Sequence, residues 1–236
     1  MFLAPYFTQQ GSQILINAEQ ASAFAKDIAG DFNPIHDVDS KRFCVPGDLL
    51  FAIVLQHYGL SRKMSVKFSG MVGADTALIL PSHDDGNINI QDTAGKDYLH
   101  IEHAGETSHD QALIEAFTRQ YVAFSGQNFP FIMVPMMEKA GVMFNPKRPL
   151  VIYERMAFEL DRLDIAAPTL ALADTKITVN GRRGDAEFTF VIEADGKTVG
   201  TGTKHLIISS LQPYDGSAMD EVIHNFNAAK ARYLNR

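Results

Sequence analysis

The chain has 236 residues, of which 46% are hydrophobic and 21% are charged. These proportions are typical of globular proteins and exclude a disordered, collagen-like or coiled-coil chain. The 21 Lys and Arg residues against 28 Asp and Glu residues give a net charge of −7, which disfavours nucleic acid or an anionic membrane surface as the main partner. At about 150 residues per domain, the length suits two small domains.

The cysteine content and the N-terminal segment bear on the compartment. The single cysteine, Cys44, cannot form an internal disulfide, and the first ten residues contain no basic segment typical of a secretory signal. The longest apolar run nearby, residues 49–55, is too short to span a bilayer. We therefore expect a cytoplasmic protein without a membrane anchor.

The first half of the chain reads as two helices, a set of short strands and a third helix. Asn17 is a good N-cap for a helix over residues 18–29, which Gly30 closes. After Pro46-Gly47, residues 48–60 are apolar nearly all round and end at Gly59, which predicts a buried helix. Turn residues then separate predicted strands, and Ser108 with Gln111 resembles a capping box for a helix that ends near residue 123. The predicted strands are residues 66–72, 76–80, 87–91 and 98–104.

The second half repeats this order from about residue 126. An apolar helix is predicted over residues 129–141, although its two prolines weaken it, and a terminal helix over residues 217–234. The strands predicted between them are residues 151–160, 169–179, 186–194 and 197–208. A buried helix followed by an antiparallel sheet, occurring twice, indicates an α+β tandem repeat in which each sheet wraps its own helix. We place the boundary between the halves at residues 125 and 126.

One loop carries residues suited to proton transfer. Asp31 lies five residues before His36, and Asn33-Pro34 between them favours a turn that brings both side chains to one point. At neutral pH the carboxylate accepts a hydrogen bond, while the imidazole accepts or donates one. Such a pair can hold one water and move its protons.

The segment Gly30-Asp31-x-Asn33-Pro34-x-His36, following a Phe-Ala helix, resembles the signature of the MaoC-like, (R)-specific enoyl-CoA hydratases. The resemblance covers about residues 18–80. It implies a hot-dog fold for residues 1–125, and residues 126–236 look like a second hot-dog without the motif, as in the double hot-dog members of that superfamily.

By this resemblance, Asp31 and His36 activate the water that adds to C3 of a trans-2-enoyl thioester, and a proton is delivered to C2. The substrate is then an acyl-CoA or acyl carrier protein thioester, and no cofactor or metal is required. Asn33 and Gly47 are the expected substrate-binding residues, with the Gly47 N–H donating to the thioester oxygen. The resemblance also allows a homodimer of double hot-dogs.

Two features leave alternatives open. The chain has Pro46-Gly47 where the family usually has His-Gly, and Asp48 adds a negative charge beside the expected oxyanion. A working hydratase would have to turn the Asp48 carboxylate outward or keep it protonated. The alternatives to a hydratase are a catalytically silent hot-dog that binds acyl thioesters or a protein partner, and a hot-dog thioesterase.

A metal site is not expected in the strand around residue 100. His100 and Glu102 share one face of that strand, while His103 lies on the other face. These three side chains therefore cannot converge on one ion within the strand.

Overall fold

The structure of the protein is a computed structural model that describes residues 2–82 and 85–235. The strands are β1 (Thr8–Gln10), β2 (Gln13–Leu15), β3 (Leu60–Phe68), β4 (Leu78–Ile79), β5 (Asn87–Asp92), β6 (Asp97–Ser108), β7 (Val142–Met143), β8 (Val151–Leu160), β9 (Thr169–Asn180), β10 (Arg183–Ala194), β11 (Lys197–Ser209) and β12 (Gln212–Pro213). The α-helices are α1 (Ala18–Phe24), α2 (Gly47–Tyr58), α3 (Gln111–Gly126), α4 (Met133–Lys139) and α5 (Gly216–Leu234). Two short 3-10 turns, η1 (Ala4–Tyr6) and η3 (Pro34–His36), and two π-turns, η2 (Ala25–Ala29) and η4 (Asn128–Ile132), complete the described elements.

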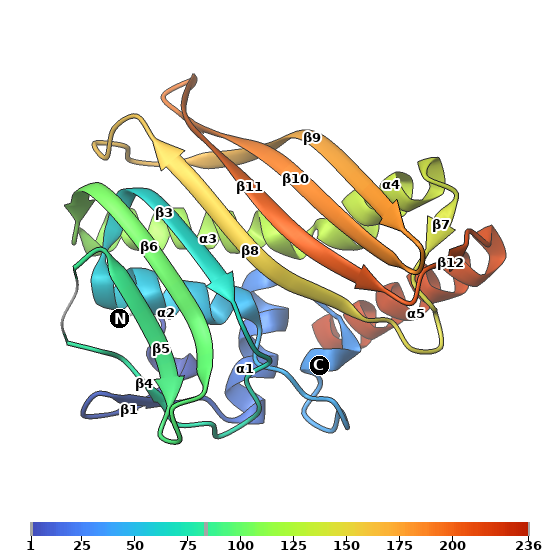
Figure 1. Ribbon diagram of the computed structural model, residues 1–236, viewed down its shortest axis with the longest axis horizontal. Coiled ribbons are helices and arrows are strands. Elements are labelled where there is room, and N and C mark those ends of the chain that lie inside the picture. Colours follow the sequence, from blue (N-terminus) through green and yellow to red (C-terminus); the bar gives the residue numbers. More distant parts are fainter. Residues whose placement is uncertain (1, 83–84, 236) are drawn as a thin grey trace.

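A single antiparallel sheet of ten strands dominates the molecule. Its strand order is β1-β2-β4-β5-β6-β3-β8-β11-β10-β9, and β7 pairs with β12 in a separate ribbon. The large sheet curves over the helices, with α2 beneath its first half and α3 running beneath both halves (Figure 1). The fold is therefore a double hot-dog of the α+β class, as the sequence predicts.

The first half wraps the helix α2. This helix has eight buried residues out of twelve, because its sequence is apolar on nearly every side. It begins at Gly47 and its C-cap is Gly59, whose φ of 90° ends the helix, in agreement with the sequence prediction. The strand that follows differs from its predicted range, since β3 covers residues 60–68 rather than 66–72 and thus starts directly after Gly59.

The second half differs more from its prediction. The expected helix over residues 129–141 is interrupted, because Phe129 before Pro130 has non-helical φ and ψ of −115° and 134°. Only the seven residues of α4 form a regular helix, and its methionines pack against Phe188 and Leu206 of the second sheet. The C-terminal part of α3 also covers this sheet, since Phe124 packs against Phe190 of β10. The second sheet therefore packs against the C-terminal part of α3 together with α4.

The two halves join through the pair β3 and β8. These strands pair antiparallel from Lys63 with Glu159 to Lys67 with Arg155, so the two sheets are continuous. The boundary proposed at residues 125 and 126 falls at the end of α3, whose last residue is Gly126. The helix α3 also connects the two halves, since its Phe117 packs against Phe158 of β8 at the junction.

Two smaller expectations concern the ends of elements. The capping box of Ser108 and Gln111 is wrong: α3 is capped by the side chain of Asp110, which accepts hydrogen bonds from the N–H groups of Ala112 and Leu113. The strand predicted over residues 76–80 is only two residues long. Within the described residues, no helix is both long enough and apolar enough to cross a membrane.

Candidate active site

The loop that carries Asp31 and His36 begins at the end of the first helix. After α1 the chain widens into the π-turn η2, and Gly30 follows with a φ of 65°, a left-handed conformation that glycine adopts without strain. The N–H of Asp31 donates to Ala25 O (2.8 Å), which closes the turn. The helix predicted over residues 18–29 is therefore confirmed in extent, and its last turn is a π-turn that leads into the motif.

The turn predicted between the two candidate catalytic residues is present. Asp31 Oδ1 accepts a hydrogen bond from the N–H of Asn33 (2.9 Å), and Asn33 Oδ1 accepts one from the N–H of Ile35 (3.2 Å). Pro34 begins the 3-10 turn η3, which ends at His36. The side chain of Asn33, a predicted substrate ligand, thus has a local role in shaping this loop.

The Asp31 and His36 side chains lie close together. Asp31 Oδ2 is 3.6 Å from His36 Nε2, and the two side chains are 31% and 12% exposed. On the other side of the ring, His36 Nδ1 lies 2.7 Å from Cys44 O. Because a carbonyl oxygen only accepts hydrogen bonds, His36 Nδ1 donates to Cys44 O, and Nε2 is the ring nitrogen that faces Asp31.

Cys44 supports His36 through its backbone. The N–H of Cys44 donates to Ile35 O (3.1 Å), which ties the segment before α2 to the motif loop. The Cys44 thiol is largely buried, and burial raises its pKa to about 11. The thiol is therefore protonated at neutral pH, and the contribution of Cys44 to the site is its carbonyl oxygen.

Gly47 is the first residue of α2, and aromatic rings from both halves surround it. A Cβ at this position would lie 2.9 Å from Tyr153 Cδ1 and 3.3 Å from Phe68 Cε1. Phe68 belongs to the first sheet and Tyr153 to the second, so any larger residue at position 47 would press on rings from both. Among the described residues, no group accepts a hydrogen bond from the N–H of Gly47, and Pro46 provides no side-chain cap.

Asp48 follows Gly47 and belongs to a cluster of polar side chains from four elements. Ser125 Oγ of α3 donates a hydrogen bond to Asp48 Oδ2 (2.5 Å), and Lys204 Nζ of β11 donates to Ser125 Oγ. Lys204 Nζ also lies 3.8 Å from Asp48 Oδ1 and 3.9 Å from the centroid of the Tyr153 ring on β8. The hydroxyl of Tyr153 is hydrogen-bonded to that of Tyr121 on α3. We refer to Asp48, Tyr121, Ser125, Tyr153 and Lys204 as the Asp48 cluster.

Burial controls the charges of this cluster. The side chains of Lys204 and Asp48 are 3% and 13% exposed. Burial raises the pKa of the Asp48 carboxyl above its usual range, while Lys204, the Ser125 hydrogen bond and His36 act against the shift and Asp31 adds to it. Burial lowers the pKa of Lys204, and the charges of Asp48 and Asp31 oppose that shift. The Asp48 side chain is therefore turned inward toward Lys204 rather than outward, and the direction of its pKa shift favours the protonated form, the other option that the sequence left open.

Lys204 is not among the residues predicted from the sequence, although the strand pattern contains a signal for it. The inward positions of β11 alternate through Gly202, Lys204, Leu206 and Ile208, which are all buried. The cross-strand neighbours of Lys204 are Phe188 and Met156, two further core residues. A lysine at a core position of a strand needs a partner, since burying an unpaired charge costs several kcal/mol. That alternation would have identified Lys204 but not its partners, because Ser125 and Asp48 are distant in sequence.

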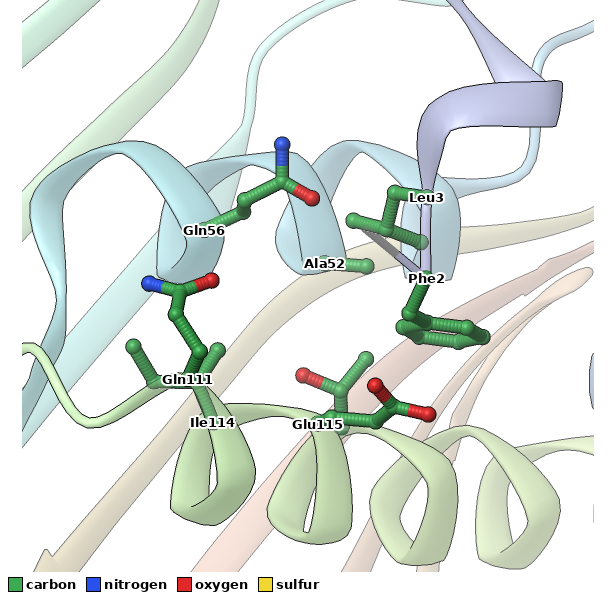
Figure 2. Close-up of a pocket in the computed structure, with 8 residues that line it drawn as sticks. Phe2, Leu3, Ala52, Gln56, Gln111, Ile114 and Glu115 are labelled. Carbon is green, nitrogen blue, oxygen red and sulfur yellow. The ribbon is translucent and has the colours of Figure 1, made fainter.

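Two cavities lie beside the helix α3. One, of about 150 Å³, is bounded by the N-terminal residues Phe2 and Leu3, by α2 and by α3, and Figure 2 shows Gln56, Gln111 and Glu115 around it. The other, of about 310 Å³, lies between the motif segment and α5, and includes Gly30 and Phe32 in its lining. Neither cavity has Asp31 or His36 in its lining, so both are distinct from the point where these two side chains meet.

The strand residues considered for a metal site are arranged as their alternation predicts. His100 Nε2 lies 3.4 Å from Glu102 Oε1 on one face of β6. His103 Nδ1 is instead hydrogen-bonded to Ser61 Oγ (3.0 Å). The three side chains do not converge.

Comparison with known proteins gives a family and a set of similar structures. No curated protein matches the chain. Among solved structures, a hot-dog protein from Alicyclobacillus acidocaldarius, described as conserved and of unknown function, has a TM-score of 0.47 and 10% identity, with 91% of this chain and 99% of that chain covered. Acyl-CoA thioesterase II TesB2 from Mycobacterium marinum has a TM-score of 0.42 and 12% identity, with 91% and 100% covered. A MaoC-like dehydratase has a TM-score of 0.41 and 12% identity, with 85% and 97% covered.

The family model described as "Protein of unknown function (DUF3581)" matches residues 1–217. This match extends from the N-terminus through β12 and thus includes the motif loop, α2 and both sheets. The chain belongs to the DUF3581 family.

Proposed function

We propose that the protein hydrates trans-2-enoyl thioesters to 3-hydroxyacyl thioesters, and catalyses the reverse dehydration, with Asp31 and His36 as catalytic residues. The observation that carries this proposal is the 3.6 Å separation of Asp31 Oδ2 and His36 Nε2, with His36 Nδ1 held by Cys44 O. One water can lie within hydrogen-bond reach of both atoms. The resemblance of residues 30–36 to the MaoC-like signature supports the same assignment.

The chemistry needs one proton to leave the water and one to reach the substrate. Asp31 accepts a hydrogen bond from the water and orients it, and the lone pair of His36 Nε2 accepts the proton as the water oxygen bonds to C3. The electron pair of the C2–C3 double bond moves toward the thioester carbonyl, and the resulting enolate is protonated at C2. The proton taken from the water returns in this step, so no cofactor is consumed.

The developing negative charge on the thioester oxygen requires a donor. Gly47 lies at the first turn of α2, where the N–H groups and the helix dipole favour negative charge. Asn33 lies between the two catalytic residues, and its amide nitrogen is the expected contact with the substrate. The assignment of Asn33 follows from its place within the motif, that of Gly47 from its place at the start of α2, and both follow from the resemblance.

A second candidate is thioester hydrolysis at the same site. The water held by Asp31 and His36 would then attack the thioester carbonyl carbon, and the thiol would leave as the acid forms. A third candidate is a site that binds acyl thioesters without turnover. All three predict acyl-thioester binding next to Asp31, and they differ in the product.

The test is to incubate the purified protein with crotonyl-CoA and with longer trans-2-enoyl-CoAs. Loss of the enoyl absorbance reports hydration, and a thiol reagent reports release of CoA. We expect hydration without CoA release. Asp31→Asn and His36→Ala should each lower the rate by about 10²-fold or more, and the double variant should lose little beyond the worse single variant, since the two groups act as a unit.

Two exposed residues of α5 provide matched controls. Asp220→Asn and His224→Ala repeat the same substitutions on a solvent-facing surface and should leave the rate unchanged. If CoA is released and this release is lost in Asp31→Asn, the proposed activity would be thioester hydrolysis instead of hydration. Saturable binding without either product, in two preparations free of host hydratase, would leave only the silent binder.

A further inference from the structure

The Asp48 cluster contains an acidic side chain beside the group that is assigned to bind the thioester oxygen. A carboxylate lies one residue from the N–H that is assigned to the thioester oxygen, and an uncompensated negative charge there opposes the developing oxyanion. Acidic side chains in the first turn of a helix commonly accept hydrogen bonds from that turn's own N–H groups. Among the described contacts, Asp48 makes no such bond with α2, and its carboxylate instead contacts Ser125 and Lys204.

The partners of Asp48 come from parts of the chain remote from α2. Ser125 is in the last turn of α3, and Lys204 is on β11 in the half that lacks the motif. Both residues are buried: counted over the whole residue, Ser125 is 5% exposed and Lys204 is 2% exposed. A lysine and an aspartate in contact carry no net charge as a pair, whichever of them holds the proton. The first turn of α2 therefore has a neutral neighbour despite its acidic residue.

We propose that Lys204 is a positioning residue for the thioester oxygen: with Ser125 it draws the Asp48 carboxylate away from the first turn of α2 and neutralises it. The N–H of Gly47 is then left to the substrate. This inference rests on the proposed function for its catalytic readout, and it assigns a role in the reaction to the second half of the molecule. The remaining charged and titratable groups that face Asp48 are Asp31 and His36 of the motif loop and the phenols Tyr121 and Tyr153.

The test compares Lys204→Met with the double variant Asp48→Asn/Lys204→Met. In Lys204→Met the Asp48 carboxyl has lost its cation, so it is neutral at low pH and becomes an uncompensated charge as the pH rises. We expect kcat for crotonyl-CoA hydration to fall by about 10-fold to 100-fold on the alkaline side of a new ionisation, with a much smaller change in KM. The double variant has no charge to compensate, and its kcat should lie within about fivefold of wild type without the new ionisation.

A second measurement does not depend on turnover. In amide NMR spectra, the Gly47 signal should change with pH in Lys204→Met as Asp48 ionises beside it, and should not show this titration in wild type or in the double variant. Lys63→Met is the control, because Lys63 is an exposed lysine on β3 that pairs with Glu159 (2.7 Å). That variant should match wild type in both measurements.

The outcomes separate this inference from the proposed function. Absence of hydration by wild type overturns the proposed reaction, while the Gly47 titration still decides whether Lys204 controls the helix end. Equal losses of kcat in Lys204→Met and the double variant, or a Gly47 signal that is the same in all proteins, would overturn the role of Lys204. If Lys204→Met does not fold, the double variant decides: a kcat more than tenfold below wild type would contradict the inference.

Discussion

At the scale of single residues, the motif loop depends on a contact made by a glycine elsewhere in the chain. A Cβ at Gly126, the last residue of α3, would lie 1.7 Å from Ala29 O, far inside any real contact. The backbones of α3 and of the π-turn before Asp31 therefore touch directly. Only glycine permits this approach.

We predict that Gly126→Ala displaces the segment around Ala29 and Asp31. Overpacking of this kind typically costs about 1–3 kcal/mol of stability, and a small misplacement of a catalytic group can cost up to about 10²-fold in rate. Urea denaturation and the hydration rate measure the two effects. Gly216→Ala is the control, because the nearest atom to a Cβ at Gly216 is 3.9 Å away. Equal behaviour of the two variants would contradict the contact.

At the scale of elements, the terminal helix α5 supports the motif loop from outside. The Phe32 ring packs edge-on against Phe226 (centroids 5.9 Å apart) and Tyr233 (5.7 Å), and the Tyr233 hydroxyl donates to Asp27 Oδ1 (2.7 Å). The C-terminal end of the chain lies beside the N-terminal motif segment in Figure 1. Most of α5 lies beyond the residues that the family model matches.

We predict that Phe226→Ala loosens the motif segment. Phe226 is 9% exposed and also packs against Phe129 (5.3 Å), so its removal should cost about 3 kcal/mol or more. Relative to wild type, amide hydrogen exchange should become faster over residues 25–36, and the increase should be smaller in the distant strand β9. Leu234→Ala is the control, since Leu234 is 68% exposed and should change stability by less than about 0.5 kcal/mol. Unchanged exchange in the motif segment would show that α5 is not needed to order it.

At the scale of the whole molecule, the two halves share one core. The larger hydrophobic cluster contains residues of α2, α3 and β6 together with Phe158, Phe190 and Ile192 from the second half. The pairing of β3 with β8 and the helix α3 add two further connections. The two halves therefore cannot separate without exposing apolar surface that is now buried.

We predict that the chain unfolds in one cooperative transition although it contains two repeats. The denaturation curves from far-UV circular dichroism and from tyrosine fluorescence should coincide, because the seven tyrosines lie in both halves and the chain has no tryptophan. Two separated transitions would show that the halves are independent folding units.

The sequence by itself determined the elements whose signals are local. The limits of α2 follow from its apolar composition and from Gly59, and the range of β8 agrees with the predicted residues 151–160. The turn that brings Asp31 toward His36 follows from Asn33 and Pro34, whose backbone preferences act within a few residues. The sequence indicated the interruption of the helix at Phe129 only in part, because a proline weakens a helix but does not decide at which residue the helix begins again.

Tertiary structure alone decided the features that join distant segments. The pairing of β3 with β8, the contact of Gly126 with Ala29 and the partners of Asp48 each connect residues that are more than 70 positions apart in the sequence. Alternation places Lys204 in the core, but the carboxylate that compensates it depends on how α2 and α3 pack under the sheet. The reason is physical: backbone preferences are properties of a few neighbouring residues, whereas the cost of burying a charge depends on everything that surrounds it.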